Sequence, residues 1–194
     1  MKKMMYYILN CTWGCIMTFI GALIAFVLIC IGKTPKKHGG CIYFNVGERW
    51  GGMELGLFFL TDSRDVTSTK NHEFGHSLQN CIWGPLFPFI ICIPSATRYW
   101  LREQKTIEDK KKFTYIVAAI AGIISLALII IGLFTLLPLS IIGLFLFIYS
   151  TLIIIWLLEY EIPKYVNGKS VPYDSIWFEG QATEWGTSHI KDFQ

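Results

Sequence analysis

Two adjacent apolar segments, residues 113–137 and 138–158, restrict the fold of this chain most, because neither contains Asp, Glu, Lys or Arg. Each is longer than the roughly 20 apolar residues that a helix needs to cross the hydrocarbon core of a bilayer. Pro138 follows Leu136 and Leu137 where the segments meet. We therefore predict a helical hairpin that crosses a membrane, with close contact between its helices at small residues: Ala118, Ala119, Ala121, Gly122 and Ser125.

A third apolar segment, residues 6–31, follows Lys2 and Lys3. A cleavable signal peptide is the competing interpretation. However, the segment is longer than a signal core, and Gly32-Lys33-Thr34-Pro35 follows it in place of an Ala-x-Ala cleavage site. Only 16% of the residues are charged, against about a quarter in soluble proteins. We therefore predict a membrane protein with three transmembrane helices, at 6–31, 113–137 and 138–158.

Between these segments lies His72-Glu73-Phe74-Gly75-His76, a His-Glu-x-x-His pattern. On a helix, residues four apart share a face, so His72 and His76 can bind one zinc ion, and Glu73 can act as general base toward a water molecule. Random order would produce this pattern roughly 0.004 times in such a chain. The competing interpretation is two half-exposed histidines on a polar helix. Because a catalytic zinc takes three protein ligands, a third must come from elsewhere.

The residues around this pattern predict a small zincin-like region over 40–100. Residues 41–46 and 53–60 have strand composition, and the zinc helix is expected over 68–83 with Thr67 or Ser68 as its N-terminal cap. Residues 85–94 are apolar but too few to cross a bilayer, and their prolines favour a re-entrant or interfacial segment. The predicted fold class is thus a mainly α membrane protein with a short β-sheet, in one domain over 1–194.

The six cysteines show no Cys-x-x-Cys pair, which favours buried free thiols over disulfides. The net charge of +3 and its distribution give no indication of a nucleic-acid partner. A basic stretch before residue 113 is either a solvated helix face or, as we prefer, a surface for anionic lipid head groups: Arg98, Arg102, Lys105, Lys110, Lys111 and Lys112.

Three spans would place residues 32–112 and the tail, 159–194, on one side of the membrane. These segments carry most of the Lys and Arg, so the positive-inside rule predicts a multi-pass protein of the cell membrane with its zinc site on the cytoplasmic side. An intramembrane site is disfavoured because residues 61–80 are polar. A metzincin is excluded because Gln79 and Ile82 stand where that class has Gly and His.

The residues alone leave the third ligand open among seven side chains that topology places on the correct side: His38, Glu159, Glu161, Asp174, Glu179, Glu184 and His189. Three side chains could also stabilise an oxyanion, although a surface role suits each of them better: Tyr165, Tyr173 and His189.

The segment Glu179-Gly180-Gln181-Ala182-Thr183 resembles the Glu-x-x-Ala-Asp helix of gluzincins of the HtpX and CAAX-prenyl-peptidase type. The resemblance implies that Glu179 is the third zinc ligand. It departs at Thr183, which can hydrogen-bond a ligand histidine but brings no charge. Either Glu184 or Asp62/Asp65 then supplies the missing carboxylate, or zinc is bound less tightly.

Residues 47–100 and 172–186 are also similar to a group of small, uncharacterised bacterial membrane proteins. Those proteins carry comparable Asn-His-Glu-Phe-Gly-His-Ser, Gly-Pro-x-x-Pro-Phe-Ile and Ile-Pro-Ser segments. This likeness covers about a third of the chain and implies no substrate.

The sequence therefore predicts a membrane-embedded zinc metallopeptidase of gluzincin type. Zinc would be held by His72, His76 and Glu179, with Glu73 as general base, and the substrate would be a peptide or a membrane protein. The 53–60 strand would either pair with an extended peptide or only pack in the core. Two alternatives remain open: a non-catalytic membrane scaffold or immunity-type protein stapled by zinc, and a hydrolase of another class.

Overall fold

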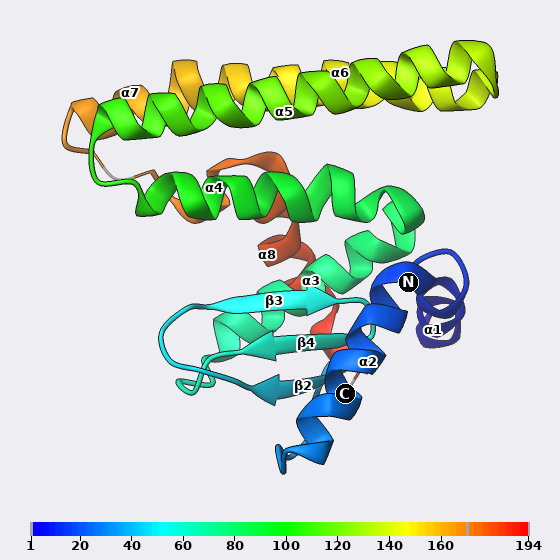
Figure 1. Ribbon diagram of the computed structural model, residues 1–194. Coiled ribbons are helices and arrows are strands. Elements are labelled where there is room, and N and C mark those ends of the chain that lie inside the picture. The colour runs from blue at the N-terminus through cyan, green and yellow to red at the C-terminus, as the bar shows by residue number, and fades with distance from the viewer. Residues whose placement is uncertain (1, 170, 194) are drawn as a thin grey trace. The chain divides into compact units, whose positions relative to one another are not determined.

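The computed structural model describes residues 2–169 and 171–193, and it is mostly helical with one four-stranded mixed sheet (Figure 1). The chain forms two compact units. The first comprises the residues up to Pro88 together with those from Tyr173 onward, and the second comprises Phe89–Pro172.

The sheet of the first unit has the strand order β1-β2-β4-β3, with bounds β1 Lys36–His38, β2 Cys41–Asn45, β3 Gly52–Leu55 and β4 Phe58–Thr61. β2 confirms the strand predicted at 41–46 and pairs in parallel with β4. The single strand predicted at 53–60 is wrong, because this stretch folds into the antiparallel pair β3 and β4. Gly56 reverses the chain with a φ of 73°, which residues with a side chain rarely adopt.

Two helices enclose this sheet. On one face, Tyr43 and Phe59 pack with Phe74 of α3 (Thr67–Trp83), the predicted zinc helix. On the other, Phe44 packs with Ala25 and Leu28 of α2 (Cys15–Cys30). The alternation of side chains along a strand thus supplies two apolar layers, and α2 and α3 lie on opposite sides of the strands (Figure 1). α3 begins after Val66, and no side chain caps it, so the caps predicted at Thr67 or Ser68 are absent.

The apolar segment at 6–31 is not one straight helix. It forms α1 (Lys3–Cys11) and α2, which meet at an angle of 84°. Polar side chains direct α1 toward the back of α3: Tyr6 Oη lies 2.9 Å from Ser77 Oγ, and Asn80 donates to Asn10 Oδ1 at 2.7 Å. Tyr6 and Asn10 are fully buried. These buried hydrogen bonds fix the direction of α1, which hydrophobicity alone does not reveal.

The first unit also contains the 3₁₀ turn η1 (Gly84–Leu86) and the C-terminal segment of the chain. That segment comprises η4 Tyr173–Ser175, α8 Trp177–His189 and η5 Ile190–Phe193.

In the second unit, α5 and α6 form the predicted hairpin, which turns at Thr135 and Leu136 (Figure 1). α5 starts before the apolar segment, where Thr106 Oγ1 accepts a hydrogen bond from Asp109 N at 3.0 Å. Two prolines were expected to interrupt residues 85–94. Pro88 begins a new helical segment, η2, whereas Pro94 lies in the first turn of α4, where proline is tolerated. The elements are η2 Pro88–Cys92, α4 Ile93–Glu103, α5 Ile107–Phe134, α6 Leu137–Trp156, η3 Leu157–Glu161 and α7 Ile162–Val166.

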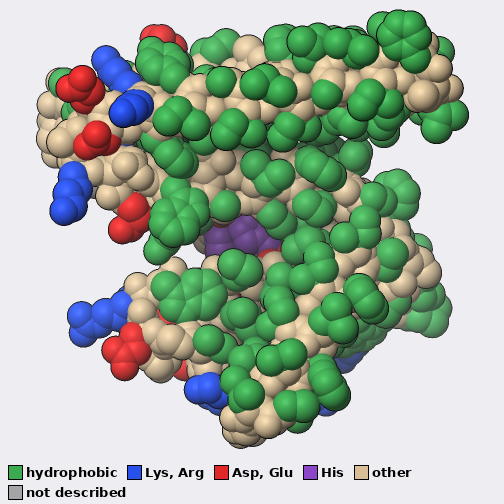
Figure 2. All heavy atoms as spheres, viewed as in Figure 1, with side chains coloured by type: hydrophobic (Ala, Val, Ile, Leu, Met, Phe, Trp, Pro, Cys, Tyr) green, Lys and Arg blue, Asp and Glu red, His purple; other side chains and the backbone are tan. Residues whose placement is uncertain are grey.

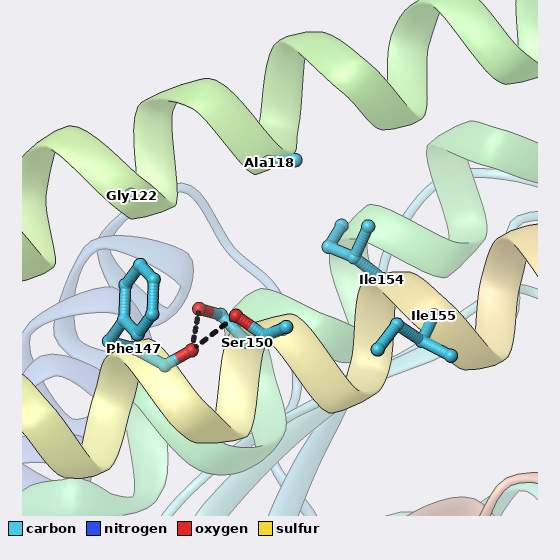
Figure 3. Close-up of a pocket in the computed structure, with 7 residues that line it drawn as sticks. Ala118, Gly122, Phe147, Ser150, Ile154 and Ile155 are labelled. Atoms are coloured by element: carbon cyan, nitrogen blue, oxygen red, sulfur yellow. Dashed lines mark hydrogen bonds between the residues drawn. The ribbon is translucent and has the colours of Figure 1, made fainter.

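Two helices are long and apolar enough to cross a membrane, Ile107–Phe134 and Leu137–Val166, or up to four if each of two bent helix pairs counts as one span. The third span predicted at 6–31 corresponds to one of these bent pairs and is not confirmed. Hydrophobic side chains cover the hairpin on the face shown in Figure 2. Between its helices lies a shallow depression of about 130 Å³, where Ser150 and Thr151 donate to the Phe147 carbonyl (Figure 3).

A buried ion cluster holds the rest of this unit together. Glu161 accepts from Arg98 Nε at 2.7 Å and from Arg102 Nε at 3.1 Å, and both Glu161 and Arg98 are fully buried. Lys110 is also buried and donates to the Leu101 carbonyl at 2.8 Å. Arg98 and Lys110 therefore do not belong to the exposed basic surface predicted for head groups.

All six cysteines are free thiols, as predicted. Cys41 and Cys81 are buried, but Cys11, Cys15 and Cys30 are exposed, which corrects the expectation that the thiols are buried. The three exposed cysteines lie on α1 and α2, within the apolar segment 6–31, where an apolar composition alone predicts burial.

Replacement of Glu161 by alanine should destabilise the second unit by about 3–5 kcal/mol, because it leaves a buried arginine without its counter-ion. Denaturant unfolding of the detergent-solubilised protein measures the loss. Glu159→Ala, two residues away and exposed, is the control and should change the unfolding free energy by less than about 0.5 kcal/mol. Equal effects of the two substitutions would contradict the role of the ion cluster.

Candidate metal centre

A close crossing of α3 and α8 brings the candidate ligands together. A β-carbon at Gly75 would overlap the carbonyl oxygen of Ala182, and one at Gly186 would overlap the carbonyl oxygen of Asn71. Only small residues permit two helix backbones to approach so closely. The crossing places Glu179, near the start of α8, opposite the histidines of α3, although more than a hundred residues separate them in the chain.

Three ligand atoms converge at this crossing. Glu179 Oε2 lies 3.0 Å from His72 Nε2 and 3.2 Å from His76 Nε2, and the two Nε2 atoms are 3.0 Å apart. His72, His76 and Glu179 form a group that could hold a metal ion, since one ligand atom from each lies within 4.8 Å of the others. Glu179 is fully buried and His76 nearly so. Histidine side chains still reach the surface on the face shown in Figure 2.

The Nδ1 atoms of His72 and His76, which lie away from the ligand group, each contact an uncharged side chain. His72 Nδ1 lies 2.8 Å from Thr183 Oγ1, and His76 Nδ1 lies 2.7 Å from Gln79 Oε1. Gln79 is itself fixed, because its amide nitrogen donates to the Phe178 carbonyl at 2.8 Å. Gln79 Oε1 can only accept, so it favours the tautomer of His76 with hydrogen on Nδ1, which leaves the lone pair of Nε2 for a metal ion. The Thr183 hydroxyl can accept from Nδ1 of His72 in the same way.

The donor set fits a metal cation. Two Nε2 lone pairs facing one carboxylate repel one another unless a positive charge lies among them. Glu179 Oε1 is also buried and has no hydrogen-bond partner among the described residues, which a cation at this position would offset. Without a metal, protons supply that charge: burial lowers the pKa of His76, but the hydrogen bond and charge of Glu179 outweigh it and raise the pKa to about 9.

Glu73 points from the same helix toward β3. Its side chain is buried, and a β-carbon at Gly52 would lie 2.5 Å from Glu73 Oε1, so only glycine leaves room for this carboxyl. Burial raises the pKa of Glu73, and the charge of Glu179 adds to that effect, whereas the two histidines oppose it. A carboxylate with a raised pKa holds a proton more readily than an exposed carboxylate does, which suits it to a role as general base.

The other side chains considered as third ligands lie outside the group. His38 Nε2 contacts Asn71 Oδ1 at 2.8 Å, Glu161 belongs to the arginine cluster, and His189 Nδ1 lies near Ser188 and the Trp185 carbonyl. Glu159, Asp174 and Glu184 are exposed. Glu179 alone among these candidates joins His72 and His76 within the described residues.

The charged substitutes proposed for Thr183 are also elsewhere. Asp62 pairs with Arg64, Asp65 pairs with Lys36 and Lys70, and neither contacts a ligand histidine. Thr183 itself hydrogen-bonds His72, as its hydroxyl suggested. Of the side chains considered for an oxyanion, the ring of Tyr173 lies 5.8 Å from that of His72, whereas Tyr165 Oη donates to Glu161 in the second unit.

Sequence reasoning missed the residues that support the ligands. Gln79 follows His76 by three residues and so shares its helix face, which is a usable signal. Gly75 stands between the two histidines and Gly186 lies two turns beyond Glu179, on the same face of α8. Gly52 has no signal in the sequence, because its role depends on how the sheet meets α3.

Comparison of the chain with protein-family models, with curated proteins and with solved structures returned no match.

Substitution of Gly75 by alanine should separate α8 from α3 and weaken metal binding by His72, His76 and Glu179, which we call the metal group. We expect a loss of about 1–3 kcal/mol in unfolding free energy, because the new methyl group meets a backbone carbonyl that cannot turn aside. Metal content after dialysis should fall in parallel. Gly122→Ala is the matched control, since a β-carbon there meets nothing within 4 Å. Normal metal retention in Gly75→Ala would show that the close crossing is not required.

Proposed function

We propose that this chain is a membrane-bound zinc peptidase that hydrolyses peptide bonds. The observation that carries the proposal is the convergence of His72 Nε2, His76 Nε2 and Glu179 Oε2 on one point beside the buried carboxyl of Glu73. Two imidazole nitrogens and one carboxylate oxygen are a ligand set of catalytic zinc sites, which keep a fourth position for water or substrate. The resemblance of residues 179–183 to the gluzincin ligand helix supports the same conclusion.

The chain supplies binding, orientation and a proton carrier around that group. Zinc, when bound, acts as a Lewis acid that polarises a carbonyl and lowers the pKa of water toward about 7. Glu73 accepts the proton that water loses on attack and returns it to the leaving amine. Thr183 and Gln79 hold the two imidazole rings in the orientation that binding requires.

β3 offers a place for the substrate backbone. It is an edge strand, paired only with β4 in the described sheet, and it packs against α3 next to Glu73. An extended peptide can add to such an edge through main-chain hydrogen bonds, which accept many side chains. We therefore infer a peptide or an extended segment of a membrane protein as substrate.

The apolar hairpin supports membrane attachment, and the distribution of basic residues supports one orientation. All 17 Lys and Arg residues lie outside residues 113–158, and none lies at the hairpin tip. By the positive-inside rule, the hairpin tip is outside the cytoplasm and the metal centre is inside it.

The main alternative is a non-catalytic scaffold in which the metal only joins α3 to α8. A structural site needs no carboxyl between its histidines, and burial of a carboxyl without a role costs free energy. Gly52 leaves space for Glu73, which favours the catalytic assignment.

Glu73→Gln should retain zinc and the fold but lower the rate of peptide hydrolysis at least about 100-fold, because only the proton carrier is lost. Zinc content by mass spectrometry and cleavage of a library of internally quenched peptides are measured on the same preparation. Glu48→Gln, on an exposed loop of the same unit, is the control. Full hydrolysis by purified Glu73→Gln protein would refute the peptidase mechanism.

Glu179→Ala should weaken zinc binding at least tenfold, because one of three ligands is removed. Glu184→Ala, on the same helix and exposed, should leave zinc content unchanged. Titration with zinc in competition with a chelator gives both affinities. If zinc survives Glu179→Ala and is lost in Glu184→Ala or His189→Ala, the ligand assignment is wrong even where the class is correct.

A further inference from the structure

The outer surface of α2 is a continuous apolar stripe. Ile16, Phe19, Leu23 and Phe26 point the same way by helical spacing, and each is between 45% and 68% exposed. The neighbouring part of α1 adds Met4, Met5 and Ile8, which are at least half exposed. An exposed apolar surface that extends over α1 and α2 indicates contact with a membrane or with another protein.

The opposite stripe of α2 is covered by the sheet. Met17, Gly21, Ala25 and Leu28 are buried on that side. Gly21 meets the backbone of Leu55, Thr18 lies against Gly56, and Leu28 packs with Phe44. The sheet thus accompanies α2 from about residue 18 to residue 28, which is most of the length of the helix.

This arrangement is incompatible with α2 as a span. If α2 crossed a bilayer, the strands beside it would lie at the depth of the hydrocarbon core. The open edge of β3 would then leave backbone N–H and C=O groups in lipid, where each unsatisfied group costs several kcal/mol. α2 is also short, because its 16 residues extend about 24 Å against a core of about 30 Å.

We propose that α2 lies in the plane of an anionic lipid bilayer, with its outer stripe immersed among the acyl chains and the sheet above it in water. Lysines flank the apolar segment at both ends, as an interfacial helix requires for contact with acidic head groups: Lys2 and Lys3 at the start of α1, and Lys33 and Lys37 after α2. The inference rests on α2 and the sheet, and it holds whether or not the chain is a peptidase.

Two consequences follow. The N-terminus lies on the same side of the membrane as residues 32–112, which replaces the three-span arrangement with a hairpin and one in-plane helix. The metal group, on the far side of the sheet from α2, lies on the order of 20 Å above the axis of α2, as two packed layers of about 10 Å require. The site therefore faces water and not the hydrocarbon core.

Spin labels at Ile16, Phe19, Leu23 and Phe26 test the proposal in vesicles of phosphatidylcholine and anionic phosphatidylglycerol. Cys11, Cys15, Cys30 and Cys92 are first replaced by alanine, and the buried Cys41 and Cys81 are retained. Immersion depth is measured by the accessibility of each label to oxygen and to a water-soluble nickel complex. An in-plane helix gives equal depths at all four positions, within a few ångströms, whereas a span gives depths that differ by about 15 Å between Ile16 and Phe26.

The matched control is a set of labels at Ile116, Ile120, Ile123 and Leu126 of α5, which are also exposed and whose first and last members are likewise ten positions apart. These labels should show the depth gradient of a span. A similar gradient along α2 would overturn the proposal. So would labels on α2 that are accessible to nickel alone, or to neither reagent, since these would indicate water or a protein partner.

A second measurement uses the protein without substitutions in α2. Small fragments of a split fluorescent reporter are fused to the N-terminus and, separately, to the C-terminus, and the complementary fragment is expressed in the cytoplasm. Fluorescence from both fusions is expected for an in-plane α2. Fluorescence from one fusion alone would place the termini on opposite sides and refute the proposal.

Discussion

The structure of the first unit depends on the contact of two helix backbones at Gly75 and Gly186. Each glycine removes the side chain that would hold α3 and α8 apart, so Glu179 can approach within 3.2 Å of both histidines. Helices separated by ordinary side chains pack at about 8–10 Å between axes. At that distance the carboxylate of a residue in position 179 would have to extend toward the histidines through intervening side chains. Close packing of the two helices therefore brings His72, His76 and Glu179 together.

The polar groups around the metal group are divided between the two faces of α3. On the face toward α8, Thr183 and Gln79 orient the ligand rings without adding charge. On the back, Tyr6 of α1 hydrogen-bonds Ser77, and Asn10 accepts a hydrogen bond from the amide nitrogen of Asn80. Buried polar groups are costly unless they are paired, so each pairing also fixes one direction of α3. The helix that carries the histidines is thereby positioned from both sides, which favours a precise ligand geometry.

The sheet separates α2 from α3, and with an in-plane α2 it would also separate lipid from water. Its α3 face carries aromatic residues that support the metal helix, and its α2 face carries aliphatic and aromatic residues under a helix with an apolar outer stripe. An in-plane α2 would hold the metal centre at a defined height above lipid. The hairpin α5 and α6 supplies the long apolar helices of the chain. Two kinds of membrane contact, one in the interface and one across the bilayer, would then belong to the two units.

The sequence by itself determined the features that depend on local spacing. The histidines at i and i+4 predicted α3, the charge-free segments predicted the hairpin, and the hydroxyl of Thr183 predicted a bond to a ligand histidine. The bend between α1 and α2, the reversal at Gly56 and the burial of Arg98 with Glu161 were decided only by tertiary structure. In each case the partner is remote in sequence: Ser77 and Asn80 for α1, Thr18 of α2 for the turn at Gly56, and Glu161 for Arg98. Hydrophobicity indicates that a segment is buried away from water. Whether it is buried by lipid, by a sheet or by another helix depends on tertiary contacts that no local sequence pattern encodes.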